Sequence, residues 1–144
     1  MTETQKQLRK AKREQQKRER EIRDRKFIAN LTRAGLPPPR KEFRFYPERL
    51  FKADFAYPEL KLLIEIEGGI FTGQAHGSVS GILRDIEKYN LAAMEGYCVY
   101  RILNKDTLST RTTQAIVRLY ARRSKEIKFI DNQTEQAKWK QSAK

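Results

Sequence analysis

The pattern of hydrophobic and polar positions separates an N-terminal arm from the rest of the 144-residue chain. Residues 6–26 are almost entirely Lys, Arg, Gln and Glu, which favour a helix, and their few apolar residues form at best a weak heptad repeat. We therefore predict a basic helix over residues 1–34, with its last two turns packed on the rest of the protein; a disordered tail over residues 1–18 is the alternative. Gly35 suits a helix C-cap, and the prolines at 37–39 then exclude a helix.

Alternating apolar and polar residues predict three strands beyond these prolines. The strands cover residues 42–46, 51–57 and 61–67, and the third is richest in Leu and Ile, which favours a central place in the sheet. A turn at residues 58–60 joins the second and third strands into a hairpin. The chain therefore enters its β-sheet through three consecutive strands.

A glycine-rich stretch and a second helix follow the strands. Five of the seven glycines lie within residues 68–81, and residues 82–95 have helical periodicity, with Gly96 as a C-cap. A buried fourth strand is expected over residues 97–103, and a final helix over residues 112–123. The residues that we expect on the inner face of the helix at 82–95 are Ile82, Ile86, Tyr89 and Ala93.

The predicted order of elements is α, β, β, β, α, β, α, which indicates an α/β fold with helices flanking a mixed four-stranded sheet. We divide the chain into a basic N-terminal helix or arm over residues 1–34, a compact domain over residues 35–123, and a partly ordered polar tail over residues 124–144. The apolar residues of the tail are able to dock on the domain.

Composition restricts the partners and the compartment. The net charge of +13 and the pI near 10.0 favour a polyanion such as DNA, because each neutralised phosphate releases a counterion. The single cysteine, Cys98, builds neither a disulfide framework nor a zinc site, which indicates a reducing compartment. The sequence shows neither an apolar signal segment nor the roughly 20 apolar residues of a membrane span, so we expect a cytoplasmic protein without membrane contact.

Three carboxylates in the predicted hairpin carry the clearest chemical signal. Glu65 and Glu67 project from one face of the third strand, and Asp54 lies on the neighbouring strand near Glu65. Carboxylates in apolar strands are costly to bury without positive charge, and three oxygen ligands suit Mg²⁺ or Mn²⁺. Such a metal would hold a phosphate and lower the pKa of a bound water. Solvent-exposed charges on an edge hairpin are the alternative, but the apolar run over residues 62–66 disfavours it.

The spacing of Asp54 and Glu65-Ile66-Glu67 resembles that of the PD-(D/E)XK nuclease superfamily. The resemblance covers about residues 40–103 and is closest to the branch of very-short-patch repair endonucleases and small phage-type endonucleases. The matching stretches, in order, are Asp54-Phe55, Pro58-Glu59-Leu60-Lys61-Leu62, Glu65-Ile66-Glu67-Gly68, His76, and Asp85 to Arg101. This resemblance implies a restriction-endonuclease-like αβββαβ core and magnesium-dependent hydrolysis of phosphodiester bonds in DNA.

Carried over residue by residue, the resemblance implies that Asp54 and Glu65 are metal ligands, with Mg²⁺ or Mn²⁺ as the cofactor. Glu67 stands where the superfamily usually has its catalytic lysine, so it either joins the metal ligands or acts as a general base. The missing positive charge then comes from Lys88, on the helix after the glycine-rich stretch, or from His76, which matches the histidine of the repair endonucleases.

The resemblance and the charge together predict contacts with DNA. The basic arm would follow phosphates, Phe71 would wedge or stack at a junction, and Arg101 either contacts phosphate or pairs with Asp85. The residues that we expect to contact nucleic acid are Lys10, Arg13, Lys17, Arg20, Arg23, Lys52, Phe71 and Arg101. The structural zinc site of the repair endonucleases has no counterpart in a chain with one Cys and one His, so we do not expect mismatch specificity of that type.

These observations predict a magnesium-dependent DNA endonuclease of phage type that is selective for branched or junction DNA. Paired nicks at a junction require two active sites, and hence a homodimer, for which the N-terminal helix is the candidate. One alternative is a DNA-binding protein on a degenerate nuclease fold, suggested by Glu67 in place of lysine. The others are a nicking repair endonuclease and a basic structural or RNA-binding protein, although the last leaves the three carboxylates unexplained.

Overall fold

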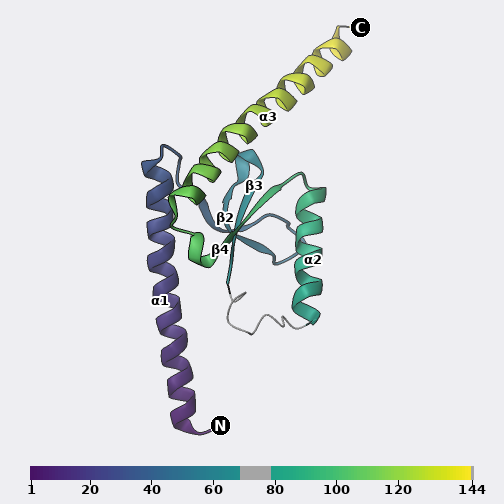
Figure 1. Ribbon diagram of the computed structural model, residues 1–144. Coiled ribbons are helices and arrows are strands. Elements are labelled where there is room, and N and C mark those ends of the chain that lie inside the picture. The colour runs from purple at the N-terminus through teal and green to yellow at the C-terminus, as the bar shows by residue number, and fades with distance from the viewer. Residues whose placement is uncertain (69–78, 144) are drawn as a thin grey trace.

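The computed structural model describes residues 1–68 and 79–143, and its centre is a four-stranded sheet (Figure 1). The strands lie in the spatial order β1-β2-β3-β4; their bounds are β1 (Arg40–Arg44), β2 (Lys52–Tyr57), β3 (Leu62–Glu67) and β4 (Cys98–Leu103). β1 and β2 pair antiparallel, as do β2 and β3, whereas β3 and β4 pair parallel. The predicted α/β fold with a mixed four-stranded sheet is confirmed.

In the part of the chain that the structure describes, three long helices flank this sheet and two short 3₁₀ helices connect elements. Their bounds are α1 (Glu3–Arg33), η1 (Pro58–Leu60), α2 (Val79–Met94), η2 (Asn104–Asp106) and α3 (Thr110–Ser142). The chain order α1, β1, β2, β3, α2, β4, α3 is the predicted one. Thr2 begins α1 with a capping box to Gln5, so the arm is helical almost from its first residue, and the alternative of a disordered tail over residues 1–18 is wrong.

The C-terminal end of the chain differs from the prediction. We expected the last helix to end at Arg123 and a partly ordered tail to follow, but α3 continues without interruption to Ser142. Residues 124–142 contain no Gly or Pro and are rich in Lys, Gln and Glu, all of which favour helix. Phe129 and Trp139 in this extension are exposed, so they do not dock on the domain.

Two glycines end helices as predicted. Gly35 has a φ of +93° and Gly96 has a φ of +77°, in the left-handed region that glycine adopts without strain. The backbone N–H of Leu36 donates to the Leu31 carbonyl, and that of Tyr97 donates to the Ala92 carbonyl, the long hydrogen bonds of a Schellman motif. These caps direct the chain from α1 toward β1 and from α2 into β4.

The apolar core lies on both faces of the sheet. On one face α1 and α3 contribute Phe27, Leu31 and Ile116, which pack against a larger set of sheet residues: Phe55, Tyr57, Leu62, Ile64 and Ile102. Phe27 is fully buried, and its ring centroid lies 5.0 Å from that of Phe55. On the other face a smaller cluster contains Leu63 of β3 and Ala92 of α2. α1 and α3, the first and last helices, therefore cover the face of the sheet that has the larger core cluster (Figure 1).

The orientation of α2 is not the predicted one. Ile82 and Ile86, expected on its inner face, are 53% and 52% exposed, and Ala93 is also exposed. The side of α2 that faces the sheet carries Tyr89, as predicted, together with Ala92 and Lys88. The inner face is polar because two carboxylates of β3 lie opposite it, and they are described in the next subsection.

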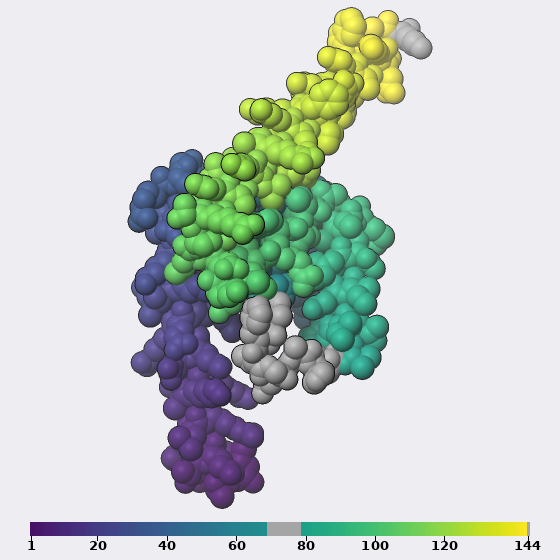
Figure 2. Space-filling model, in the orientation of Figure 1, coloured from purple at the N-terminus to yellow at the C-terminus, as the bar shows by residue number. Residues whose placement is uncertain are grey.

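Figure 2 shows the N-terminal part of α1 and the C-terminal part of α3 standing out from the body of the protein in different directions. The side chains of the first 20 residues are all exposed. No helix in residues 1–68 or 79–143 is long and apolar enough to cross a membrane.

Candidate active site

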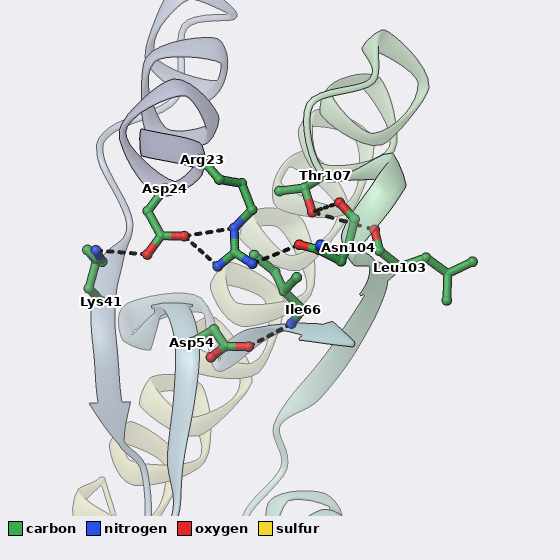
Figure 3. Close-up of polar contacts among 8 residues, drawn as sticks. All are labelled: Arg23, Asp24, Lys41, Asp54, Ile66, Leu103, Asn104 and Thr107. Atoms are coloured by element: carbon green, nitrogen blue, oxygen red, sulfur yellow. Dashed lines mark hydrogen bonds and ion pairs between the residues drawn. The ribbon is translucent and has the colours of Figure 1, made fainter. Parts of the chain in front are cut away.

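The ends of β2 and β3 bring the three predicted carboxylates into one region. Regular pairing of the two strands runs from Tyr57 opposite Leu62 to Phe55 opposite Ile64, so the next position would place Asp54 opposite Glu65. Instead, Asp54 Oδ2 accepts a hydrogen bond from the backbone N–H of Ile66 at 2.7 Å (Figure 3). The Asp54 carboxylate thus serves as a hydrogen-bond acceptor for the β3 backbone at the point where β2 and β3 stop pairing.

Glu65 is a buried carboxylate with a cationic partner. Its side chain is 9% exposed, and its Oε1 lies 2.6 Å from Nζ of Lys88 on α2. Within the described residues, Oε1 depends on this ion pair for compensation of its charge. Lys88 Nζ also donates to the carbonyl of Lys52 at 2.8 Å, which fixes the ammonium group between β2 and β3.

Burial raises the pKa of Glu65 to about 6, above its usual value of 4.5. The ammonium group of Lys88 lowers this pKa, while the charges of Asp54 and Glu67 raise it. Desolvation exceeds the effect of Lys88, so Glu65 takes up a proton at a higher pH than an ordinary glutamate. Buried carboxylates with a perturbed pKa and charged neighbours are often found at functional sites.

Glu67 makes different contacts from those of the other two carboxylates. Its Oε1 accepts hydrogen bonds from Nε of Arg101 at 2.7 Å and from the hydroxyl of Tyr89 at 3.2 Å. The Arg101 guanidinium also lies over the Tyr89 ring, 4.7 Å from its centroid. Burial raises the pKa of the Tyr89 hydroxyl, which therefore stays protonated as a donor. Arg101, expected to contact phosphate or to pair with Asp85, has Glu67 as its direct partner.

Asp54 also lines a cleft of about 670 Å³ between α1 and η2. Arg20 and Arg23 of α1 and Lys105 at η2 line the same cleft, and Glu19 is its second acidic residue, so three basic and two acidic side chains meet there. Basic side chains at a cleft attract a polyanion such as a phosphodiester chain.

A polar network beside this cleft fixes α1 to the sheet, and the sequence had not pointed to it (Figure 3). Arg23 donates to Asp24 Oδ1 from two nitrogens, at 3.0 and 2.6 Å, and to Asn104 Oδ1 at 2.9 Å. Asp24 is 5% exposed and also pairs with Lys41 at 2.9 Å. Arg23, expected to contact DNA, is held within the protein by these bonds. The signal for Asp24 was its helical spacing with Phe27 and Leu31, the buried face of α1.

The remaining predicted residues are spread along the surface. Lys52 is exposed on β2, and Lys10, Arg13, Lys17 and Arg20 are exposed along α1, where Lys17 and Arg20 line clefts that Asp54 also lines. His76 and Phe71 lie outside the described residues. Of the two candidates for the missing positive charge, Lys88 is therefore the one whose position is known, and it lies against Glu65.

The described residues contain no group of three or more His, Cys, Asp and Glu side chains that could hold a metal ion. Glu67 is paired with Arg101 and Glu65 with Lys88, while Asp54 lies close enough to Glu65 for its charge to raise the pKa of that group. A pair fits Mg²⁺, since this ion is usually bound through one or two carboxylates, keeps several waters and takes further oxygens from substrate phosphates. In comparisons with protein-family models, curated proteins and solved structures, none matches this chain.

Proposed function

We propose that the protein is a divalent-metal-dependent DNA endonuclease that acts on branched or junction DNA. The observation that carries this proposal is the buried Glu65, in contact with Lys88 and adjacent to Asp54 where β2 and β3 separate. A buried Glu65 paired with a lysine beside a second, partly exposed acid is an expensive arrangement for a structural role alone, and phosphodiester hydrolysis uses all three groups.

The order α1, β1, β2, β3, α2, β4 supports a finer assignment to the αβββαβ core of PD-(D/E)XK nucleases. In this assignment Asp54 and Glu65 would hold Mg²⁺ or Mn²⁺. When bound, the metal would supply an activated water and stabilise the leaving oxygen. A cation at Glu65 competes with Lys88 for the same carboxylate, so the lysine becomes free to turn toward a phosphate oxygen. In the superfamily a lysine stands at the position of Glu67 and contributes the positive charge of the site. Lys88 would contribute that charge here.

Recognition of DNA shape rather than sequence is supported by the charge of α1. This helix carries 12 Lys and Arg residues against five Asp and Glu, and most of them are exposed. Such a surface contacts phosphates, which position a protein on DNA without reading its bases. Arg20 and Lys105, at the cleft that Asp54 lines, would continue these contacts to the scissile bond.

The second candidate is a DNA-binding protein on the same fold without cleavage activity. The observation in its favour is the contact of Glu67 with Arg101, because a carboxylate and its partner occupy the place of the superfamily lysine. This candidate predicts DNA binding that persists without metal and without Asp54 or Glu65.

The decisive experiment compares wild type, Asp54→Asn and Glu59→Gln on four-way junction, flap, linear duplex and plasmid DNA, with Mg²⁺, Mn²⁺ or EDTA. We expect metal-dependent cutting by wild type. Asp54→Asn should lower the rate about 100-fold, because the amide still accepts the Ile66 hydrogen bond but has lost its charge for the metal. Glu59, exposed in η1, is the matched control and should cut as wild type does. Intact DNA in every reaction, with normal binding, would favour the second candidate.

The pKa of Glu65 predicts how cleavage depends on pH. Metal binding needs the ionised carboxylate, so at subsaturating Mg²⁺ the cleavage rate should fall as the pH drops through about 6. The direction follows from burial, which favours the protonated, neutral form of Glu65. A ¹³C NMR titration of the Glu65 carboxyl carbon should show a midpoint near 6, and saturating Mg²⁺ should shift that midpoint downward. A midpoint at or below 4.5 in the metal-free protein would contradict this interpretation of the site.

A further inference from the structure

We propose that two copies of this chain associate through the outer face of α2. This face, called here the α2 apolar face, consists of residues that are between 52 and 74% exposed, namely Val79, Ile82, Leu83, Ile86 and Met94. It is independent of the proposed nuclease function, because none of its residues takes part in the site. Figure 1 shows α2 at the edge of the protein, on the side of the sheet opposite α1.

The α2 apolar face is a continuous stripe. Val79, Ile82, Leu83 and Ile86 follow the spacing i, i+3, i+4, i+7, which is the pattern of a helix that buries one side. Single exposed aliphatic residues are common on proteins, but a contiguous stripe of them usually marks an interaction surface. Here that side points away from the chain's own sheet.

The helix has this orientation because its polar side is needed inside. Lys88 contacts Glu65, and Tyr89 contacts Glu67, so turning α2 to bury its apolar side would leave two inward-facing carboxylates without these partners. The Arg49–Glu87 ion pair, which joins α2 to the segment before β2, holds the same orientation. The outer apolar side is therefore a fixed feature of the folded chain that residues 1–68 and 79–143 leave uncovered, and a second molecule can bury it.

The charge distribution identifies a second copy as that molecule. The chain carries a net charge of +13, so two copies repel each other over most of their surfaces. α2 carries two basic and two acidic residues and is neutral overall, whereas α1 carries 12 basic and five acidic residues. Copies meet with the least repulsion at α2. The same absence of excess positive charge makes this face unsuited to a nucleic acid.

The geometry of one helix also suits self-association. A twofold axis perpendicular to α2 places Ile82, Leu83 and Ile86 against the same residues of a second copy, which is the isologous contact of most homodimers. Pairing through α1, which the sequence had suggested, would bring together two strongly basic helices whose exposed apolar residues, Leu8 and Ile22, lie four turns apart. A dimer built on α2 leaves both α1 helices free to contact DNA.

The test is the oligomeric state of the full chain, measured by sedimentation equilibrium at moderate salt over a range of concentrations. We expect a dimer for wild type and at least a 100-fold weaker self-association for Ile82→Glu/Ile86→Glu. Phe129→Glu/Ile130→Glu on α3 and Leu8→Glu on α1, matched changes at other exposed apolar positions, should leave the dimer intact. Because all these side chains are exposed, circular dichroism should show the same helix content in each variant.

Several results would overturn the proposal. One is a wild-type protein that is monomeric at every concentration, and another is a dimer that survives Ile82→Glu/Ile86→Glu. A dimer that is lost in the α3 or α1 variant but kept in the α2 variant would place the interface elsewhere. DNA binding by the Ile82→Glu/Ile86→Glu variant distinguishes the dimer proposal from the proposed nuclease function. This measurement tests the basic surface of α1 without requiring a dimer.

Discussion

Replacing Lys88 by methionine should destabilise the protein by about 2–3 kcal/mol at pH 8, because removal of one partner leaves the ionised form of a buried carboxylate uncompensated. Both side chains of this ion pair are largely buried, at 14% exposed for Lys88 and 9% for Glu65. The same change should lower metal-dependent cleavage on the order of 1,000-fold, the effect of losing a positioned charge that stabilises the transition state. Chemical denaturation and single-turnover cleavage measure the two effects.

The pH dependence of this loss distinguishes electrostatics from packing. In wild type, burial already raises the pKa of Glu65 to about 6 from 4.5. Lys88 is the group that lowers this pKa, so Lys88→Met should raise it further. A carboxylic acid whose pKa is higher in the folded protein than in the unfolded protein destabilises the fold when it ionises. The free energy of unfolding therefore falls as the pH rises from the pKa of the unfolded state through the pKa of the folded state. The penalty of Lys88→Met should therefore be small at pH 4.5 and largest above pH 6.

Two variants serve as controls for Lys88→Met. Lys128→Met removes one charge from an exposed position of α3 and should change neither stability nor cleavage appreciably. The double variant Glu65→Gln/Lys88→Met removes both charges and should recover most of the stability but none of the activity. A penalty for Lys88→Met that is equal at pH 4.5 and pH 8 would show that the lysine acts by packing alone, and would remove the main support for the site.

The elements of the compact domain were predictable because local signals agree with the final fold. The prolines at 37–39 and the glycines at 35 and 96 mark the ends of helices, and the structure places left-handed caps at both glycines. Strand alternation and the Leu-rich third strand predicted a mixed four-stranded sheet with its elements in the observed chain order. Asp54 and Glu65 were predicted to lie on neighbouring strands, and they do; the hydrogen bond of Asp54 to the Ile66 backbone was not predictable, because it depends on where the strands separate.

The inner face of α2 could not be predicted from periodicity, since periodicity identifies an apolar side but not the direction in which it points. The direction is set by Lys88 and Tyr89, whose partners on β3 are distant in the sequence. The length of α3 was missed for a related reason. A polar segment without Gly or Pro is compatible with either a tail or an exposed helix, and its composition alone did not decide between them.

The attachment of α1 to the sheet should depend on Phe27 more than on any charged residue of that helix. Phe27 is fully buried against Phe55, and its replacement by alanine should destabilise the protein by about 3–5 kcal/mol through lost burial and a cavity. Leu8→Ala, at a position 66% exposed on the same helix, is the matched control and should stay within about 0.5 kcal/mol of wild type. Chemical denaturation of the three proteins measures the difference.

The functional consequence of Phe27→Ala follows from its place next to the polar network. Phe27 lies one turn after Asp24 and Arg23, whose bonds to Lys41 and Asn104 fix α1 at the cleft that Asp54 lines. If packing at Phe27 is what holds Arg20 at this cleft, the variant should lose DNA affinity at temperatures where it is still folded, while Leu8→Ala retains it. Equal stability of Phe27→Ala and wild type would mean that α1 is attached through Asp24 and its partners, and that the apolar contact is secondary.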